Sequence, residues 1–297
     1  MAGQRTGVVH GRLRENEPMA RHTSWRVGGP ADRYYTPSSI DDLRQFIASL
    51  PSDEPIFWVG LGSNLLVRDG GVRGTVICTH GVLAGLERLA DGSVRAEAGV
   101  PCAKLARQCV RWGLGSAEFF AGIPGTVGGA LAMNAGAFGG ETWSHVLFVE
   151  TVDRQGVLHR RDKDAYDISY RSVRGPGEEW FLAATFRFRE DAKASTADIK
   201  ALLARRKASQ PIGLPSCGSV FRNPPGDHAA RLIESAGLKG RRIGGAEVSE
   251  KHANFIINAG GASALDIERL IDFVRDTVEQ VHGIRLQPEV RVIGEAE

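Results

Sequence analysis

The segment from Ala121 to Gly140 constrains this chain more than any other part of it. It reads AGIPGTVGGALAMNAGAFGG, twenty residues with seven glycines and no charged side chain. So little side chain leaves backbone N–H groups uncovered and lets a large, flat or anionic group approach the main chain closely. A membrane-spanning helix is the competing interpretation, but Pro124 and the glycines make the segment a poor helix former. We therefore predict a loop that cradles a cofactor and opens a short helix.

Composition and cysteine spacing are typical of an ordinary globular protein with reduced thiols. The 297 residues suffice for two or three domains, and 42% hydrophobic and 24% charged residues are average values. A net charge of +2 gives no reason to expect a nucleic-acid partner. The N-terminal residues lack the apolar core of a signal peptide, and the four cysteines show neither a C-x-x-C pair nor zinc spacing. We expect a cytoplasmic monomer without a metal, a membrane or a nucleic-acid partner.

Hydrophobic patterning alternates between helix and strand along the whole chain, without internal repeats. The patterns and capping residues predict helices over 39–50, 101–112, 196–206, 228–237 and 264–282, of which 196–206 is basic and amphipathic. Strands are predicted over 31–36, 55–59, 94–98, 147–152, 157–161, 180–188, 244–248, 254–259 and 289–293, with a hairpin turn at 153–156. A Pro- and Gly-rich boundary at 210–215 sets off a C-terminal α+β unit.

Two glycine-rich loops remain as candidate cofactor sites once the common motifs are excluded. The chain contains no G-x-G-x-x-G, Walker A, H-E-x-x-H or G-x-S-x-G sequence. The loops Gly60–Asn64 and Gly122–Gly129 interleave glycine with Ser, Asn and Thr, which are neutral hydrogen-bond donors. The first loop joins two predicted strands, a geometry that forms an anion-binding nest. Together the loops suit a cofactor that carries both a pyrophosphate and a planar ring.

Six motifs in a fixed order give the chain a resemblance to one flavoenzyme family. They are Arg21–Gly29, Gly60–Val67, Ala121–Gly140, Tyr170–Ser172, Pro215–Pro224 and Pro288–Arg291. Over residues 22–294 the chain closely resembles the UDP-N-acetylenolpyruvoylglucosamine reductases of peptidoglycan precursor synthesis. The resemblance implies an α+β fold: an FAD-binding domain of the vanillyl-alcohol-oxidase type with two α+β subdomains, and a C-terminal α+β substrate-binding domain. The expected boundaries are 1–80, 81–205 and 206–287, and the last strand, near 288–297, is a candidate to return to the first subdomain.

The same resemblance implies an NADPH-dependent reduction of an enolpyruvyl ether to a lactyl ether. Hydride from flavin N5 would reach the methylene carbon and leave negative charge on the carbon that bears the carboxylate. Arg171 and Glu289 are implied to stabilise that charge, and Ser219 to donate the proton. Taken alone, these residues would fit a surface arginine, a turn serine and a solvent-facing acid. The resemblance overrides those interpretations because three separate motifs each match locally.

Binding residues follow from the resemblance as well. FAD is expected to bind non-covalently, because neither loop offers a His or Cys for covalent attachment. Tyr170, Lys207 and Asn223 are candidate substrate contacts, although Lys207 also fits a solvated charge at a helix end. The expected FAD contacts are Gly60, Gly62, Ser63, Asn64, Leu65, Gly122, Ile123, Pro124, Gly125, Thr126, Gly128, Gly129, Ala130 and Asn134.

Departures from the family pattern define a subtype and leave two alternatives. Arg222 stands where many relatives carry Lys, and Phe138 replaces a frequent Tyr. Only residues 172–179 separate the Tyr-Arg motif from the next strand, so the tyrosine lid loop is absent and the shorter subtype is expected. Another FAD-dependent oxidase of the same superfamily and a flavin-binding regulator without turnover remain alternatives. The Ser219 motif argues against an oxidase, which needs no proton donor opposite N5.

Overall fold

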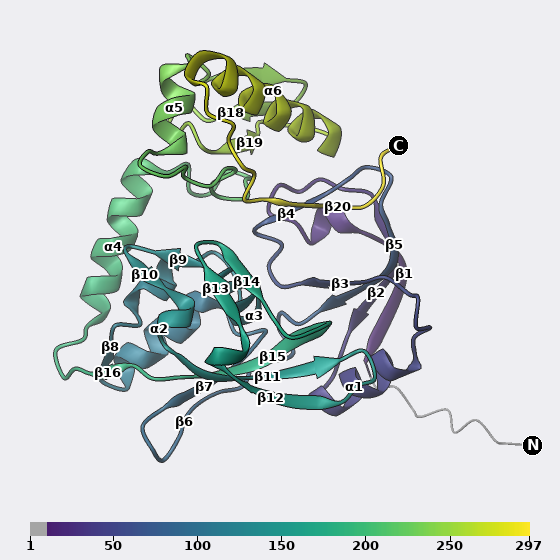
Figure 1. Ribbon diagram of the computed structural model, residues 1–297, viewed down its shortest axis with the longest axis vertical. Coiled ribbons are helices and arrows are strands. Elements are labelled where there is room, and N and C mark those ends of the chain that lie inside the picture. The colour runs from purple at the N-terminus through teal and green to yellow at the C-terminus, as the bar shows by residue number, and fades with distance from the viewer. Residues whose placement is uncertain (1–10) are drawn as a thin grey trace, which may run out of the picture. The chain divides into compact units, whose positions relative to one another are not determined.

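A computed structural model describes residues 11–297 as two compact units (Figure 1). Unit 1 comprises Arg33–Gly60 and Gly74–Thr196 together with residues 11–15, and unit 2 comprises Asn16–Asp32, Leu61–Arg73 and Ala197–Glu297. Residues 1–10, where the first predicted subdomain begins, lie outside the described residues. The predicted three-domain boundaries stay a prediction. None of the helices over residues 11–297 has the length and apolar content that crossing a bilayer requires.

A five-stranded antiparallel sheet forms the centre of unit 1. Its strand order is β12-β11-β15-β7-β6. Neighbouring residues of the central strand β15, such as Ala183 and Ala184, are both buried, so both faces of the sheet are covered there. The strands are β6 (Leu86–Arg88), β7 (Val94–Glu97), β11 (Val146–Asp153), β12 (Leu158–Asp162) and β15 (Glu179–Phe186).

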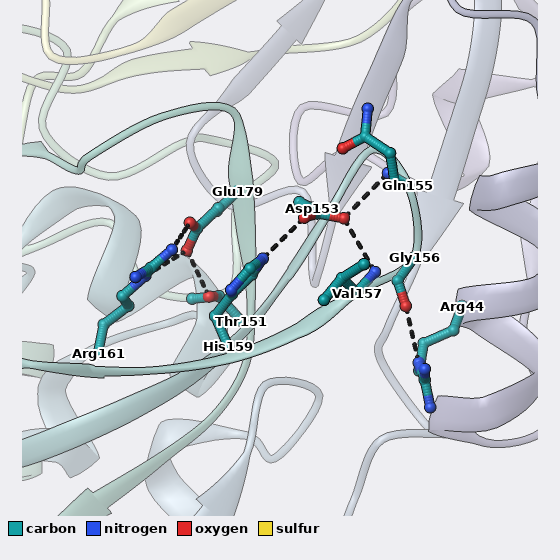
Figure 2. Close-up of polar contacts among 9 residues, drawn as sticks. All are labelled: Arg44, Thr151, Asp153, Gln155, Gly156, Val157, His159, Arg161 and Glu179. Atoms are coloured by element: carbon teal, nitrogen blue, oxygen red, sulfur yellow. Dashed lines mark hydrogen bonds and ion pairs between the residues drawn. The ribbon is translucent and has the colours of Figure 1, made fainter.

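The hairpin between β11 and β12 follows the predicted turn chemistry (Figure 2). Asp153 accepts hydrogen bonds from the backbone N–H groups of Gln155 and Val157, both at 2.9 Å, and from His159 Nε2 at 2.7 Å. Gly156 takes the left-handed conformation that the turn requires, with φ of 76°. Its carbonyl accepts a hydrogen bond of 2.8 Å from Arg44 Nε on the first helix. The hairpin prediction is confirmed.

A neighbouring carboxylate ties the same hairpin to β15 (Figure 2). Glu179 accepts hydrogen bonds from Thr151 at 2.6 Å and from the Arg161 guanidinium, whose Nη2 lies 2.5 Å from Oε1. The hydrogen bonds from the Arg161 guanidinium lower the pKa of the Glu179 carboxyl. The three strands of this edge are therefore joined by side chains as well as by the backbone ladder.

A second sheet has the order β1-β2-β5-β3, in which β3 and β5 are parallel. Helix α1 (Ile40–Ser49) begins where predicted, because Ser39 Oγ accepts the N–H of Asp42 at 3.1 Å. Leu43, Phe46 and Ile47 of α1 share one buried cluster with side chains of the sheet. The strands are β1 (Arg12–Pro18), β2 (Pro30–Thr36), β3 (Ile56–Val59) and β5 (Val72–Cys78), and β1, β2 and β5 carry the chain from one unit to the other.

The remaining elements of unit 1 are short. Only residues 175–178 separate β14 from β15, in agreement with the predicted absence of a lid loop. Helices are α2 (Cys102–Arg111) and α3 (Val127–Met133), with 3₁₀ turns at Glu118–Gly122, Thr142–Ser144 and Lys163–Ala165. Strand pairs are β8 (Leu114–Gly115) with β16 (Arg189–Glu190), β9 (Gly136–Ala137) with β10 (Gly140–Glu141), and β13 (Asp167–Ser169) with β14 (Ser172–Arg174).

Unit 2 builds its core around one long helix. In Figure 1, α6 lies beside α5, β18 and β19. Ser263 and Asp266 form the capping box of α6, Asp69 accepts the N–H groups of Ala264 and Leu265 at 2.9 Å, and Gly283 ends the helix. The elements are α4 (Thr196–Ser209), α5 (Ala229–Ser235), α6 (Ala264–His282), β4 (Leu65–Val67) parallel to β20 (Arg291–Ile293), the sheet β17 (Arg242–Ile243), β18 (Ala246–Val248) and β19 (Ile256–Asn258), and a 3₁₀ turn at Met19–Arg21.

Trp25 packs in the unit 2 core. It is completely buried, and its indole donates to the carbonyl of Ile256 at 2.7 Å. The prediction that the basic helix is amphipathic is wrong. Ile199 is the one buried residue of α4, while Leu202 and Leu203 are only half-buried. Ile199, Leu202 and Leu203 share one side of α4, but Arg206 follows on that side, so the apolar stripe is only about one turn long.

Candidate active site

The second glycine-rich loop is pinned by its backbone to the end of β7 and the start of α2. The N–H of Cys102 donates to the carbonyl of Gly125 at 2.9 Å. Val127 and Gly128 donate in turn to the carbonyls of Val100 and Ala98, both at 2.9 Å. Helix α3 then begins at Val127, so the predicted loop that opens a short helix is present.

Thr126 lies so close to Gly60 that only glycine fits at that position. A Cβ added at Gly60, at the end of β3, would lie 2.5 Å from Thr126 Oγ1, so the first loop starts in contact with the second. Gly129 is different, because a Cβ there would meet only Thr126 Oγ1, at 3.9 Å. The exposed face of α3 at Gly129 is therefore bare backbone with open space beside it.

The first loop offers free backbone donors in unit 2. In the described part of the chain, the N–H groups of Leu61, Gly62 and Ser63 donate no hydrogen bond to another protein group. The carbonyl of Gly62 is held by the N–H of Ser24 at 3.0 Å, and Gly62 has a left-handed φ of 60°. Consecutive N–H groups that lack protein acceptors form a nest for an anionic group. Taken separately, the nest in unit 2 suits an anionic group such as a pyrophosphate, and the bare backbone of α3 in unit 1 suits the approach of a flat group.

Arg171 lies in the turn between β13 and β14 in unit 1. Its guanidinium donates from Nη1 to the carbonyl of Asn134 at 3.2 Å and from Nη2 to that of Gly136 at 3.1 Å. Asn134 is the residue that caps the C-terminal end of α3, where the helix dipole favours a cation. Arg171 itself has a left-handed φ of 55°, so the hairpin turn bends sharply at this side chain. The segment that carries the flavin motif thus positions the predicted catalytic arginine.

The Asn134 carboxamide is engaged inside unit 1. Its Nδ2 donates to Glu141 at 3.0 Å and to the carbonyl of Ser169 at 3.3 Å, and its Oδ1 accepts the N–H of Trp143 at 3.1 Å. These bonds connect the end of α3 to the hairpin that bears Arg171. A direct contact between Asn134 and FAD stays a prediction.

Ser219 and Glu289 lie on neighbouring segments of unit 2. The N–H of Glu289 donates to the carbonyl of Val220 at 2.7 Å, and Phe221 pairs with Pro288 in an antiparallel bridge. Ser219 is half-buried, and within residues 11–297 its hydroxyl makes no hydrogen bond. Two of the three predicted catalytic residues are thus brought together by the backbone, and the Ser219 proton is available to an acceptor from outside the protein.

Asn64 connects the first loop to this pair. Its Nδ2 donates to the carbonyl of Glu289 at 3.0 Å, and its own carbonyl accepts the N–H of Arg291 at 3.1 Å. Cys217 Sγ lies 3.5 Å from the carbonyl of Leu65. Burial raises the pKa of the Cys217 thiol, which therefore stays neutral and packs as a small apolar side chain.

The predicted substrate contacts are found at exposed positions. Tyr170 is 45% exposed beneath the Arg171 guanidinium, whose Cζ lies 5.1 Å from the ring centroid. Asn223 accepts the N–H of Ala229 at 3.1 Å and thereby helps to start α5. The Lys207 carbonyl accepts a hydrogen bond from Lys251 Nζ, and the Lys207 side chain is exposed near the end of α4. A role in substrate binding stays a prediction for all three.

Comparisons with known proteins agree with this geometry. Residues 31–162 match the family model of an FAD binding domain, and residues 210–293 match the model of the UDP-N-acetylenolpyruvoylglucosamine reductase C-terminal domain. The reductase of Alkalilimnicola ehrlichii is 63% identical over 100% of this chain and 99% of its own length. That of Methylococcus capsulatus is 59% identical over 95% of this chain and 93% of its own length.

A solved structure extends the likeness to the fold. The crystal structure of the reductase from Thermus caldophilus has a TM-score of 0.80 and 32% identity, and it covers 95% of this chain and 99% of its own. The matches confirm the predicted α+β fold with an FAD-binding and a C-terminal domain, and they confirm FAD as the cofactor. The chain belongs to the UDP-N-acetylenolpyruvoylglucosamine reductase family.

Proposed function

We propose that this chain reduces UDP-N-acetylglucosamine enolpyruvate to UDP-N-acetylmuramate with NADPH in peptidoglycan precursor synthesis. It does so as a cytoplasmic monomer with non-covalently bound FAD. The observation that supports the proposal is the hydrogen bond of 2.7 Å from Glu289 N–H to the Val220 carbonyl, which joins the segment of Ser219 to that of Glu289. Family membership over the whole chain supports the choice of substrate.

In this reaction the chain's own residues stabilise the negative charge on the substrate and donate the proton. Bound FAD would supply the hydride chemistry that links NADPH to the methylene carbon of the enolpyruvyl group. Addition of hydride breaks the carbon–carbon π bond and leaves an electron pair on the carbon that bears the carboxylate. The Ser219 O–H bond then breaks as its proton forms the new C–H bond, and solvent returns a proton to the serine.

Two side chains stabilise the negative charge before protonation. The Arg171 guanidinium, oriented by the carbonyls of Asn134 and Gly136, places a fixed positive charge at the substrate carboxylate. Glu289 acts together with Arg171 in stabilising this negative charge. Tyr170, Lys207 and Asn223 bind the UDP-sugar, and the N–H groups of the first loop bind the FAD pyrophosphate.

The alternative is an oxidase of the same flavin-binding superfamily, which would return electrons to oxygen. The hydroxyl of Ser219 favours the reductase, since it makes no hydrogen bond within residues 11–297 and an oxidase has no use for a proton donor. A regulator without turnover would need neither Arg171 nor Ser219 in a defined place.

Steady-state kinetics test the proposal. NADPH and the enolpyruvyl substrate meet the same reactive face of the cofactor in turn, so initial-rate plots at several NADPH concentrations should give parallel lines. Excess of the second substrate should inhibit, because it occupies the face that NADPH needs. Intersecting lines would show a ternary complex instead. NADPH consumption that depends on oxygen and not on the enolpyruvyl compound would favour the oxidase.

A further inference from the structure

A buried asparagine braces the segment that carries Ser219. Asn254 lies in the turn just before β19 and is 3% exposed. Its carboxamide pairs with both backbone groups of Phe221: Oδ1 accepts the N–H at 3.0 Å, and Nδ2 donates to the carbonyl at 2.8 Å. The Asn254 carbonyl accepts the N–H of Val220 at 2.9 Å. One residue thus makes three hydrogen bonds to the two positions that follow Ser219.

The opposite side of the same segment is held by the strand that bears Glu289. The carbonyl of Val220 accepts the N–H of Glu289 at 2.7 Å, and the N–H of Arg222 donates to the carbonyl of Gln287 at 2.9 Å. Val220 therefore donates to Asn254 and accepts from Glu289, so its peptide groups are fixed between the two segments. The distance between the backbones of Ser219 and Glu289 depends on this arrangement.

Ser219 has no side-chain bond of its own to set its direction. Within the residues that the structure describes, its hydroxyl makes no hydrogen bond, and Gly218 before it has a left-handed φ of 73° with open space around it. The position of the hydroxyl is therefore set by the backbone that follows, which Asn254 holds. A displacement of about 1 Å at a reacting group can reduce a rate by roughly 10²-fold.

We propose that Asn254 is a positioning residue for the proton transfer, acting through the backbone of Val220 and Phe221 on the Ser219 hydroxyl. The inference rests on the proposed function, in which Ser219 is the proton donor. A carboxamide suits this position because it offers an acceptor and a donor side by side, which match the N–H and the carbonyl of one residue.

Asn254→Asp tests the pairing with almost no change in shape. An ionised carboxylate keeps the acceptor for the Phe221 N–H but turns a second acceptor toward the Phe221 carbonyl. We expect flavin reoxidation by the enolpyruvyl substrate to slow by at least about tenfold at neutral pH, with flavin reduction by NADPH within about twofold of wild type. A protonated carboxyl group again offers an acceptor and a donor, so the reoxidation rate of the variant relative to wild type should recover as the pH falls.

The pH comparison needs a reference, because charged residues flank the position on each bonded segment. Lys251 and His252 lie on its own turn, Arg222 follows Phe221, and Glu289 lies on the strand beyond Val220. All of them are present in wild type and in every variant, so the ratio of variant to wild-type rates is the quantity compared.

Asn258→Asp is the matched control. Asn258 ends β19, donates from Nδ2 to the carbonyl of Trp25 at 3.0 Å, and accepts the N–H groups of Gly260 and Ala262. The same substitution there also removes one donor from a backbone carbonyl but touches no residue next to Ser219. We expect a lower unfolding temperature, comparable to that of Asn254→Asp, with both half-reactions within about twofold of wild type.

Stopped-flow measurements of flavin absorbance distinguish the positioning role of Asn254 from the proton-donor role of Ser219. Slow reoxidation in Asn254→Asp with recovery at low pH, and neither in Asn258→Asp, supports the positioning role. Normal reoxidation in Asn254→Asp, or equal slowing of both half-reactions without recovery, overturns it even if Ser219→Ala is slow. Normal reoxidation in Ser219→Ala overturns the proton-donor role itself, and the positioning role with it.

Discussion

Ser219→Ala is expected to slow flavin reoxidation by the enolpyruvyl substrate by about 10²–10⁴-fold, the range credited to a positioned general acid. Flavin reduction by NADPH should stay nearly unchanged, because no proton is delivered to the substrate in that half-reaction. The hydroxyl makes no hydrogen bond within residues 11–297, so its removal breaks no hydrogen bond of the described protein and should not unfold the chain. Stopped-flow absorbance of the flavin follows the two half-reactions separately.

Two further variants show whether slow reoxidation results from the loss of a proton donor. Ser219→Cys should recover part of the reoxidation rate, since a thiol also donates a proton from that position. Ser216→Ala removes a serine hydroxyl from the same segment, three positions earlier, and should leave both half-reactions at wild-type rates. Equal slowing of both halves in Ser219→Ala would mean that the serine only shapes its surroundings.

Gly129→Leu is expected to yield colourless protein with no reductase activity. The exposed face of α3 at Gly129 has open space beside it, so a leucine fits the protein itself. It also replaces a glycine in the first turn of α3 by a residue of higher helix propensity. A loss of flavin therefore reports a blocked approach to the backbone rather than a damaged fold. The ratio of flavin to protein absorbance after purification measures the effect.

Gly177→Leu is the control for that variant. Gly177 is also exposed, a Cβ there meets no atom within 4 Å, and its φ is not in the left-handed region. It lies between β14 and β15, away from both glycine-rich loops in the sequence, so the variant should stay yellow. A yellow Gly129→Leu would contradict the proposed approach of FAD to α3. A flavin that remains with acid-precipitated wild-type chain would contradict non-covalent binding.

Elements whose ends are marked by capping residues could be predicted from the sequence. The helix over 264–282 is found with the predicted bounds, because a capping box opens it and Gly283 closes it. Strand β5 was missed: it is buried on both faces and interrupted by Gly74, so it lacks the alternation that marks a strand. The β13–β14 hairpin was missed as well, because Arg171 occupies its left-handed position where the turn rules expect Gly or Asn.

Some residues of the candidate site could also be predicted from the sequence, and others could not. Local motifs and the family resemblance pointed to Ser219, Glu289 and Arg171, since each stands in a recognisable stretch of sequence. Asn254 could not be found in this way, because its partners Val220 and Phe221 lie more than thirty positions earlier and the pairing exists only after folding. A buried asparagine next to a short strand gives no signal of its own. Sequence patterns thus identify groups that meet the substrate more readily than groups that hold them in place.

Anaerobic single turnover tests the central claim most directly. Enzyme reduced with one equivalent of NADPH is mixed with UDP-N-acetylglucosamine enolpyruvate in the absence of oxygen, and flavin absorbance and product are measured together. Our account predicts that the absorbance of oxidised flavin returns while one equivalent of UDP-N-acetylmuramate forms. Flavin that stays reduced with this substrate, and is reoxidised only when oxygen is admitted, would contradict it.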